Sequence, residues 1–97
     1  YNALETVFIE EKDIIGVIHF AAFKSVPESV DNPFKYYHNN INSLLNLLEL
    51  ALKYKVNNLI FSSSCSVYGN IASLPVSEDT PLNKAICTYA YTKQIGE

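Results

Sequence analysis

Two short apolar runs on either side of one long helical pattern constrain the fold of this chain more than any other feature. Residues 17–22 and 59–64 are each typical of a buried β-strand. Between them, Asn32-Pro33 predicts a helix start, because asparagine caps helices and proline suits their first position. Apolar residues then recur at steps of three and four and predict one buried helix face: Phe34, Tyr37, Ile41, Leu44, Leu45, Leu48 and Leu52. Strand, helix and strand in this order predict a parallel pair joined by a right-handed crossover.

The remaining segments complete a layered α/β pattern. Residues 3–12 predict an amphipathic helix with Leu4, Val7 and Phe8 facing inward. Residues 70–87 predict an irregular connection, which at that length is usually functional, and a last helix begins near Thr88. We therefore predict an α/β fold, in which a strand, a helix, a strand and a helix form part of a doubly wound parallel sheet.

Composition argues against several classes of protein. The chain has 97 residues, enough for at most one domain, and with 48% hydrophobic and 18% charged residues it is typical of globular proteins. A net charge of −3 and the absence of arginine argue against nucleic-acid binding, and no apolar run reaches the length of a membrane span. Cys65 and Cys87 are too few for a disulfide scaffold or a four-ligand zinc site, so we expect a reducing cytoplasm and no metal.

Tyr89 and Lys93 form a Tyr-x-x-x-Lys pair, and Ser64 lies 25 positions before the tyrosine. Residues four apart share a helix face, and a neighbouring ammonium favours a phenolate that can act as an acid/base near neutral pH. Ser64 ends the second apolar run, where open α/β sheets bind ligands. The pair alone also fits a partly buried tyrosine beside a solvated lysine. A Ser-His-Asp nucleophile at Ser64 is the other alternative, but the Gly-x-Ser-x-Gly elbow is absent.

Three segments together carry a family resemblance. They are Val-Ile-His-Phe-Ala-Ala-Phe-Lys-Ser-Val at 17–26, Tyr-Tyr-His-Asn-Asn at 36–40, and Phe-Ser-Ser-Ser-Cys-Ser-Val-Tyr-Gly at 61–69. In order and separation these segments resemble UDP-glucose 4-epimerases, which belong to the extended short-chain dehydrogenase/reductases. The resemblance implies a Rossmann-like sheet, and it covers about residues 13–97. Thr88 and Ala90, which flank Tyr89, differ from the usual family residues, but neither change removes a reacting group.

The resemblance implies a reaction that interconverts UDP-galactose and UDP-glucose at carbon 4 of the sugar, with NAD as the cofactor. It makes Tyr89 the base, Lys93 the residue that activates the tyrosine and binds the nicotinamide ribose, and Ser64 the partner of the 4-hydroxyl. Other cofactor contacts fall on the turn after the first strand and on the long helix; they are Phe20, Ala21, Ala22, Phe23, Lys24 and Asn39. Ser64 and Tyr89 contact both cofactor and substrate, and Lys24 also contacts the substrate. Many family members are homodimers that pack through the long helix and the tyrosine-bearing helix.

The family's phosphate-binding loop is absent, because Gly16, Gly69 and Gly96 are far apart and form no Gly-x-x-Gly-x-x-Gly pattern. We therefore expect residues 1–97 to be the central and C-terminal part of an NAD-binding Rossmann domain, with the phosphate loop and the substrate domain outside this chain. On this interpretation the isolated piece is inactive, and it is marginally folded or aggregates.

Two alternatives to a UDP-glucose 4-epimerase stay open. One is another NAD-dependent nucleotide-sugar epimerase or a dehydratase of the same superfamily. Dehydratases typically carry acidic residues after the strand serine, whereas Cys65-Ser66 stand here, which disfavours dehydration. The other alternative is a catalytically silent NAD-binding regulator. Such proteins usually lose the tyrosine or the lysine, and both are present.

Overall fold

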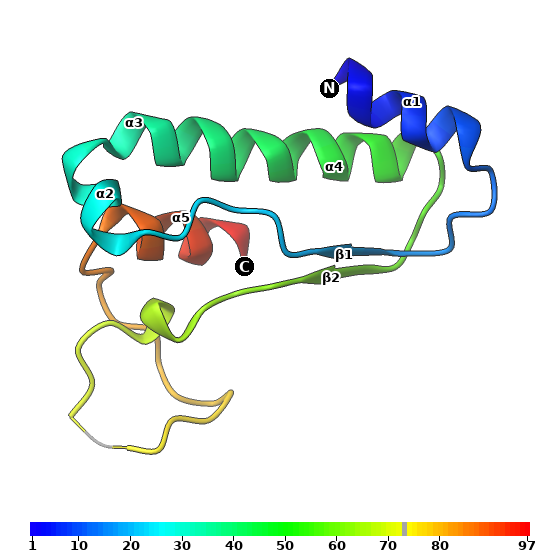
Figure 1. The fold of residues 1–97 in the computed structure, drawn as a ribbon. Coiled ribbons are helices and arrows are strands. Elements are labelled where there is room, and N and C mark those ends of the chain that lie inside the picture. The colour runs from blue at the N-terminus through cyan, green and yellow to red at the C-terminus, as the bar shows by residue number, and fades with distance from the viewer. Residues whose placement is uncertain (73) are drawn as a thin grey trace.

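The computed structural model describes residues 1–72 and 74–97 and has two layers (Figure 1). One layer is a parallel pair of short strands, β1 (Val17–His19) and β2 (Leu59–Phe61), with Val17 opposite Leu59 and His19 opposite Phe61. The other layer is helical and lies over one face of this pair. The parallel pair and its helical crossover confirm the predicted α/β class, although both strands end three residues earlier than the apolar runs do.

The long crossover helix begins where the sequence predicts. Helix α3 (Pro33–Tyr36) is capped by Asn32, whose side chain accepts a hydrogen bond of 3.3 Å from the Lys35 amide. It continues through a π-helical turn, η1 (Tyr37–Ile41), into α4 (Asn42–Lys53). The π-helical turn was not predicted. Figure 1 shows the three elements as one continuous rod above the strands.

The predicted buried face of this helix is largely wrong. Leu44 is buried, but Phe34 and Leu52 are 74% and 82% exposed, and Leu45 and Leu48 are also exposed. The residues that α4 buries are Leu44, Leu47, Leu50 and Ala51. Apolar residues stand on two faces of this helix. The pattern that starts at Phe34, which is exposed before the π-helical turn begins, follows the face that does not cover the strands.

The core lies where α4 meets α1 (Asn2–Glu10) and the strands. Its buried members are Phe8, Leu47, Leu50, Ala51 and Val56, with Leu4, Ile14, Val17, Tyr54 and Leu59 packed around them. The inward position of Phe8 confirms the amphipathic helix at the start of the chain, whereas Val7 is 47% exposed and its predicted burial is wrong.

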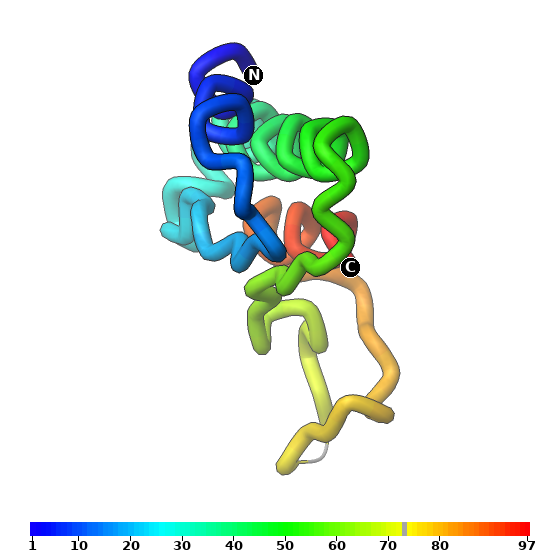
Figure 2. Tube along the Cα trace, turned by 90° about the vertical axis from the view of Figure 1, so that its right-hand side faces the viewer, coloured from blue at the N-terminus to red at the C-terminus, as the bar shows by residue number. Residues whose placement is uncertain are grey.

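A helix that the sequence did not predict follows the first strand. Helix α2 (Val26–Asp31) starts at Ser25, whose side chain accepts a hydrogen bond of 3.4 Å from the Glu28 amide. The last helix, α5 (Thr88–Gly96), begins at the predicted residue and packs against α2, α3, η1 and the 3₁₀ turn η2 (Cys65–Tyr68). Figure 2 shows the irregular connection before α5 extending away from the helices. None of the helices in residues 1–72 and 74–97 is long and apolar enough to cross a membrane.

Candidate active site

The carboxyl ends of both strands meet α5 through hydrogen bonds. The Ser62 amide donates to the His19 carbonyl at 3.1 Å, which continues the strand pairing beyond β2. The Ser62 carbonyl in turn accepts a hydrogen bond from Lys93 Nζ at 2.5 Å. The turn after β1 reaches α5 as well, because Asn40 bonds to both Phe23 and Thr92. The structure therefore gathers the predicted serine strand end, cofactor turn and tyrosine-bearing helix at one edge of the sheet.

Lys93 is a buried lysine that has no carboxylate partner among the described residues. Its exposed fraction is 4%, and its ammonium lies 4.8 Å from the centroid of the Phe61 ring. The two ion pairs that the described residues form join Lys35 to Glu28 and Lys53 to Glu5. Burial lowers the pKa of Lys93 below its ordinary value, since the charged form loses hydration. A buried ammonium held by a carbonyl and an aromatic ring is uncommon and is typical of functional sites.

Ser64 lies three residues after the end of β2 and caps η2. Its Oγ accepts hydrogen bonds from the Ser66 amide at 3.3 Å and from the Ser66 hydroxyl at 2.9 Å. These two bonds orient the Ser64 hydroxyl and leave its own proton to be donated elsewhere. Within residues 1–72 and 74–97, no histidine hydrogen-bonds to Ser64, which argues against a Ser-His-Asp nucleophile.

Tyr89 lies in the first turn of α5, half-buried, four residues before Lys93 on the same helix. Its carbonyl accepts a hydrogen bond of 2.8 Å from Thr92 Oγ1. Among the described residues its phenol makes no hydrogen bond, so the structure does not join the hydroxyl directly to Ser64 or Lys93. The 3₁₀ turn η2, which Ser64 caps, packs against α5, the helix that bears Tyr89.

The turn between β1 and α2 is largely open to solvent. Phe20 is 73% exposed, Ala21 and Lys24 are exposed, and Ala22 is half-buried. Phe23 is 39% exposed, and the Lys35 ammonium lies 4.7 Å from its ring centroid. The open turn offers small side chains, aromatic surface and a lysine to a ligand at the sheet edge.

The two asparagines of the π-helical turn have different positions. Asn39, the predicted cofactor residue, is half-buried, and its side-chain Nδ2 donates a hydrogen bond to Asn40 Oδ1 at 3.0 Å. Asn40 is 7% exposed, and its side-chain amide forms hydrogen bonds with the Phe23 backbone and with Thr92. The sequence interpretation missed Asn40 and Tyr36. Tyr36 and Asn40 are four positions apart, which puts both side chains on one helix face. This spacing is the sequence signal that could have identified them.

His19 ends β1 beside Lys93. The ring is 8% exposed and stacks on Phe61 with centroids 6.1 Å apart. Burial, and secondly the Lys93 ammonium, lower the pKa of His19 below its ordinary value. The described residues contain no group of three histidine, cysteine, aspartate or glutamate side chains that could hold a metal ion.

Comparison with known proteins agrees with this arrangement. The sequence model of the NAD dependent epimerase/dehydratase family matches residues 2–97. The chain is 47% identical over 96 residues to UDP-glucose 4-epimerase of Caenorhabditis elegans, covering 98% of this chain and 27% of that protein. It is also 47% identical over 96 residues to the Bacillus subtilis (strain 168) enzyme, covering 99% of this chain and 28% of that protein.

Solved structures show the same likeness in three dimensions. UDP-glucose 4-epimerase from Bifidobacterium longum, in complex with NAD+ and UDP, superimposes with a TM-score of 0.94 at 43% identity. That match covers 98% of this chain and 28% of the bacterial one. The chain thus spans about a quarter of the length of the relatives it matches. With its parallel strands, its helical crossover and these relatives, the chain belongs to the NAD dependent epimerase/dehydratase family and has a Rossmann-like fold.

Proposed function

We propose that the full-length protein is a UDP-glucose 4-epimerase, which interconverts UDP-galactose and UDP-glucose at carbon 4 of the sugar with NAD as its cofactor. The observation that carries this proposal is the buried Lys93, which has no carboxylate partner among the described residues and shares α5 with Tyr89. The relatives at 47% identity, whose names describe this activity, support it.

The proton chemistry falls to three side chains. Tyr89 Oη removes the proton from the 4-hydroxyl, and Ser64, whose Oγ accepts two bonds from Ser66, uses its remaining proton to hold the same oxygen. The Lys93 ammonium stabilises the phenolate form of Tyr89. Because Lys93 is 4% exposed, its charge acts through surroundings of low dielectric constant, where it is stronger than in water. When bound, NAD supplies reversible hydride transfer at the sugar carbon.

The exposed turn after β1 fits a nucleotide cofactor. Ala21 and Ala22 allow close approach to the backbone, and the exposed ring of Phe20 provides apolar surface. We assign Phe20, Ala21, Ala22, Phe23, Lys24 and Asn39 to the cofactor, and Lys24 also to the substrate. On this proposal residues 1–97 form the central and C-terminal part of the NAD-binding domain, and the pyrophosphate loop and substrate domain lie outside them.

The full-length enzyme is proposed to be a cytoplasmic homodimer. The outward face of α4 exposes Leu45, Leu48 and Leu52, and α5 exposes Tyr91 and Ile95. Exposed apolar side chains on two neighbouring helices suit a helical dimer interface, which agrees with the family resemblance.

NMR-monitored turnover of UDP-galactose by the full-length protein, without added NAD, tests the function. We expect UDP-glucose to appear, because the family retains its cofactor. No conversion of UDP-galactose, even with NAD supplied, would contradict the proposal and favour a sister nucleotide-sugar enzyme.

The role of Tyr89 is tested by Tyr89→Phe in the same protein, with Tyr91→Phe as the matched control. Removing the Tyr89 phenol oxygen should lower kcat by at least about 100-fold while NAD stays bound. Tyr91, two residues later and 49% exposed, should tolerate the same change. Undiminished turnover by Tyr89→Phe rules out its role as the base.

A further inference from the structure

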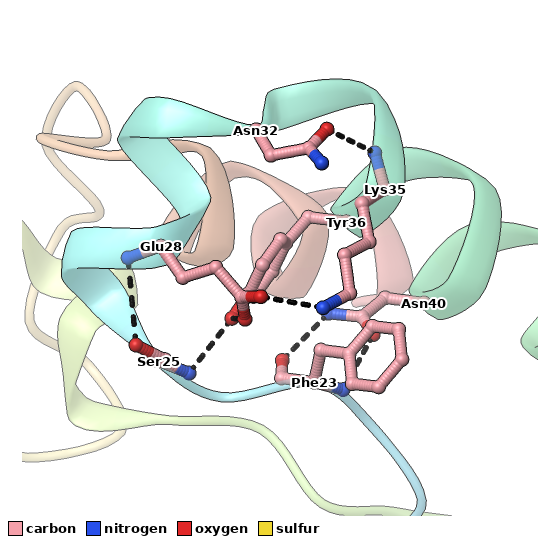
Figure 3. Close-up of polar contacts among 7 residues, drawn as sticks. All are labelled: Phe23, Ser25, Glu28, Asn32, Lys35, Tyr36 and Asn40. Atoms are coloured by element: carbon pink, nitrogen blue, oxygen red, sulfur yellow. Dashed lines mark hydrogen bonds and ion pairs between the residues drawn. The ribbon is translucent and has the colours of Figure 1, made fainter.

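Two side chains from the crossover helix hold the backbone on both sides of Lys24. Asn40 Oδ1 accepts a hydrogen bond from the Phe23 amide at 2.8 Å, and Asn40 Nδ2 donates to the Phe23 carbonyl at 3.0 Å. On the other side of Lys24, the Ser25 amide donates to Tyr36 Oη at 3.0 Å. Figure 3 shows Tyr36 and Asn40 pointing from the helix toward the turn. We call Tyr36 and Asn40 the Lys24 clamp.

The burial of both residues indicates that the clamp is a specific feature. Tyr36 has an exposed fraction of 0% and Asn40 of 7%. A buried phenol or amide destabilises a fold unless its polar atoms are paired, and asparagine is a poor residue inside a helix. Here the polar atoms of both side chains are paired, and half of their partners are backbone groups of one short turn. Lys24 itself stays exposed between these two anchored neighbours.

A carboxylate on α2 completes the clamp. Glu28 Oε2 accepts a hydrogen bond of 2.8 Å from Tyr36 Oη, and Glu28 Oε1 accepts one of 2.5 Å from Lys35 Nζ. The hydrogen bond from Lys35, and secondly the one from Tyr36, lower the pKa of Glu28 below its ordinary value. Glu28 is therefore ionised at neutral pH and orients the Tyr36 phenol, which leaves a phenol lone pair directed at the Ser25 amide.

The clamp also reaches the helix that bears Tyr89 and Lys93. The second proton of Asn40 Nδ2 is donated to Thr92 Oγ1 at 3.2 Å, and Thr92 Oγ1 donates to the Tyr89 carbonyl at 2.8 Å. One amide thus connects the Lys24 turn to the first turn of α5. Asn40 therefore links the backbone next to Lys24 to the backbone of Tyr89.

We propose that Tyr36 and Asn40 are positioning residues that fix Lys24 relative to Tyr89 and Lys93, so that its ammonium meets the nucleotide ligand in one place. This inference rests on the proposed function, which assigns Lys24 to cofactor and substrate. It predicts that loss of either clamp residue reduces the contribution of Lys24 to turnover, although neither residue touches the ligand.

The test compares matched variants of the full-length holoenzyme. Tyr36→Phe removes only the clamp hydroxyl. Its control is Tyr54→Phe, because Tyr54 also donates to a glutamate, Glu5, at 3.2 Å, and the preceding lysine, Lys53, pairs with that same glutamate. Asn40→Asp removes the donor to Phe23 and Thr92. Its control is Asn42→Asp, the same change two residues later at an exposed position.

Hydrogen exchange measured by mass spectrometry reports on the clamp without using activity. Tyr36→Phe and Asn40→Asp should increase deuterium uptake in residues 20–28, and Tyr54→Phe and Asn42→Asp should not. If Asn40→Asp fails to fold, Thr92→Val and Thr92→Ser replace it, since only the serine keeps the hydroxyl that Asn40 binds. Unchanged uptake in Tyr36→Phe and in the Asn40 or Thr92 variant overturns the proposal.

A double-mutant cycle with Lys24→Ala separates positioning from general stability. We expect Tyr36→Phe to lower kcat/KM by about tenfold in the presence of Lys24, and by much less when Lys24 is already alanine. Equal losses in the two backgrounds overturn the assigned role of Lys24. If the unsubstituted protein converts no UDP-sugar, the proposed function fails, and the exchange measurement still decides whether the clamp exists.

Discussion

At the scale of single residues, Lys93 combines a proposed role in catalysis with a cost in stability. Its ammonium is buried, with a carbonyl and an aromatic ring as its described partners. Burial of an ammonium without a carboxylate disfavours the folded state, and the lowered pKa of Lys93 expresses the same cost. The chain keeps an unfavourable charge where the proposed chemistry needs one.

We therefore predict that Lys93→Met in the full-length protein lowers kcat by at least about 100-fold and raises the melting temperature of the NAD-free protein. Methionine keeps the apolar stem, and Ser62, whose carbonyl loses its donor, is only half-buried. Turnover assays and calorimetry check the two effects. Lys84→Met, at an exposed lysine, should change neither quantity. A lower melting temperature for Lys93→Met contradicts the stated cost.

His19 predicts a pH dependence of stability. Its pKa in the folded protein lies below the ordinary value of 6.5, chiefly because of burial. As the pH falls through 6.5, the unfolded chain binds a proton that the folded chain resists, so folding loses free energy in this interval. In the His19→Gln variant, the free energy of unfolding should fall less steeply as the pH drops below 6.5. Chemical denaturation of the full-length protein from about pH 7.5 to about pH 5 measures it, and His38→Gln is the exposed control. An unchanged slope in His19→Gln contradicts the prediction.

The sequence predicted the residues whose spacing is local and missed those whose partners are distant. Tyr89 and Lys93 are four apart on one helix, and Ser64 ends an apolar run, so pattern alone places them. The partners of Asn40 are at Phe23 and Thr92, 17 and 52 positions away. Such contacts depend on how the turn packs on the helix. A buried amide was predictable from the asparagine pair, but which asparagine is buried was not, because the π-helical turn sets the direction of each side chain.

At the scale of elements, the Asn32-Pro33 capping signal was a better predictor than apolar periodicity. Asn32 caps α3 as expected, whereas the helices capped by Ser25 and Cys87 were not identified from their caps. The periodic pattern failed on α4 because this helix has apolar residues on two faces, and only one of them covers the strands. Helix α2 was missed because six residues containing a proline give no clear period.

Helix α5 has a weak cap that can be improved. Cys87 Sγ accepts a hydrogen bond from the Ala90 amide at 3.4 Å, and sulfur is a weak acceptor. Serine is a preferred capping residue, so Cys87→Ser should stabilise the full-length protein by about 0.5 kcal/mol. Urea denaturation checks this value. Cys65→Ser makes the same atomic change at an exposed thiol and should have no effect. A destabilised Cys87→Ser protein would mean that Cys87 contributes by packing rather than by capping.

At the scale of the whole molecule, one face of the sheet has no cover within the described chain. Val17 and His19 face the helices, whereas Ile18 and its register partner Ile60 are 58% and 62% exposed on the opposite face. Doubly wound sheets carry helices on both faces. Since this chain spans about a quarter of its relatives, we expect another part of the full-length protein to cover these two isoleucines.

The double substitution Ile18→Thr, Ile60→Thr should therefore improve the solution behaviour of the 97-residue chain but destabilise the full-length protein. In the 97-residue chain alone it should reduce self-association, because it makes an exposed apolar face more polar. In the full-length protein it should lower the free energy of unfolding by about 2–4 kcal/mol, because both side chains are then buried. Analytical ultracentrifugation measures the first effect and chemical denaturation the second.

Val30→Thr, at a position on α2 that is 63% exposed, serves as the control in both contexts. A full-length double variant as stable as this control would show that the Ile18 and Ile60 face stays open to solvent, and the doubly wound arrangement would then not extend over it.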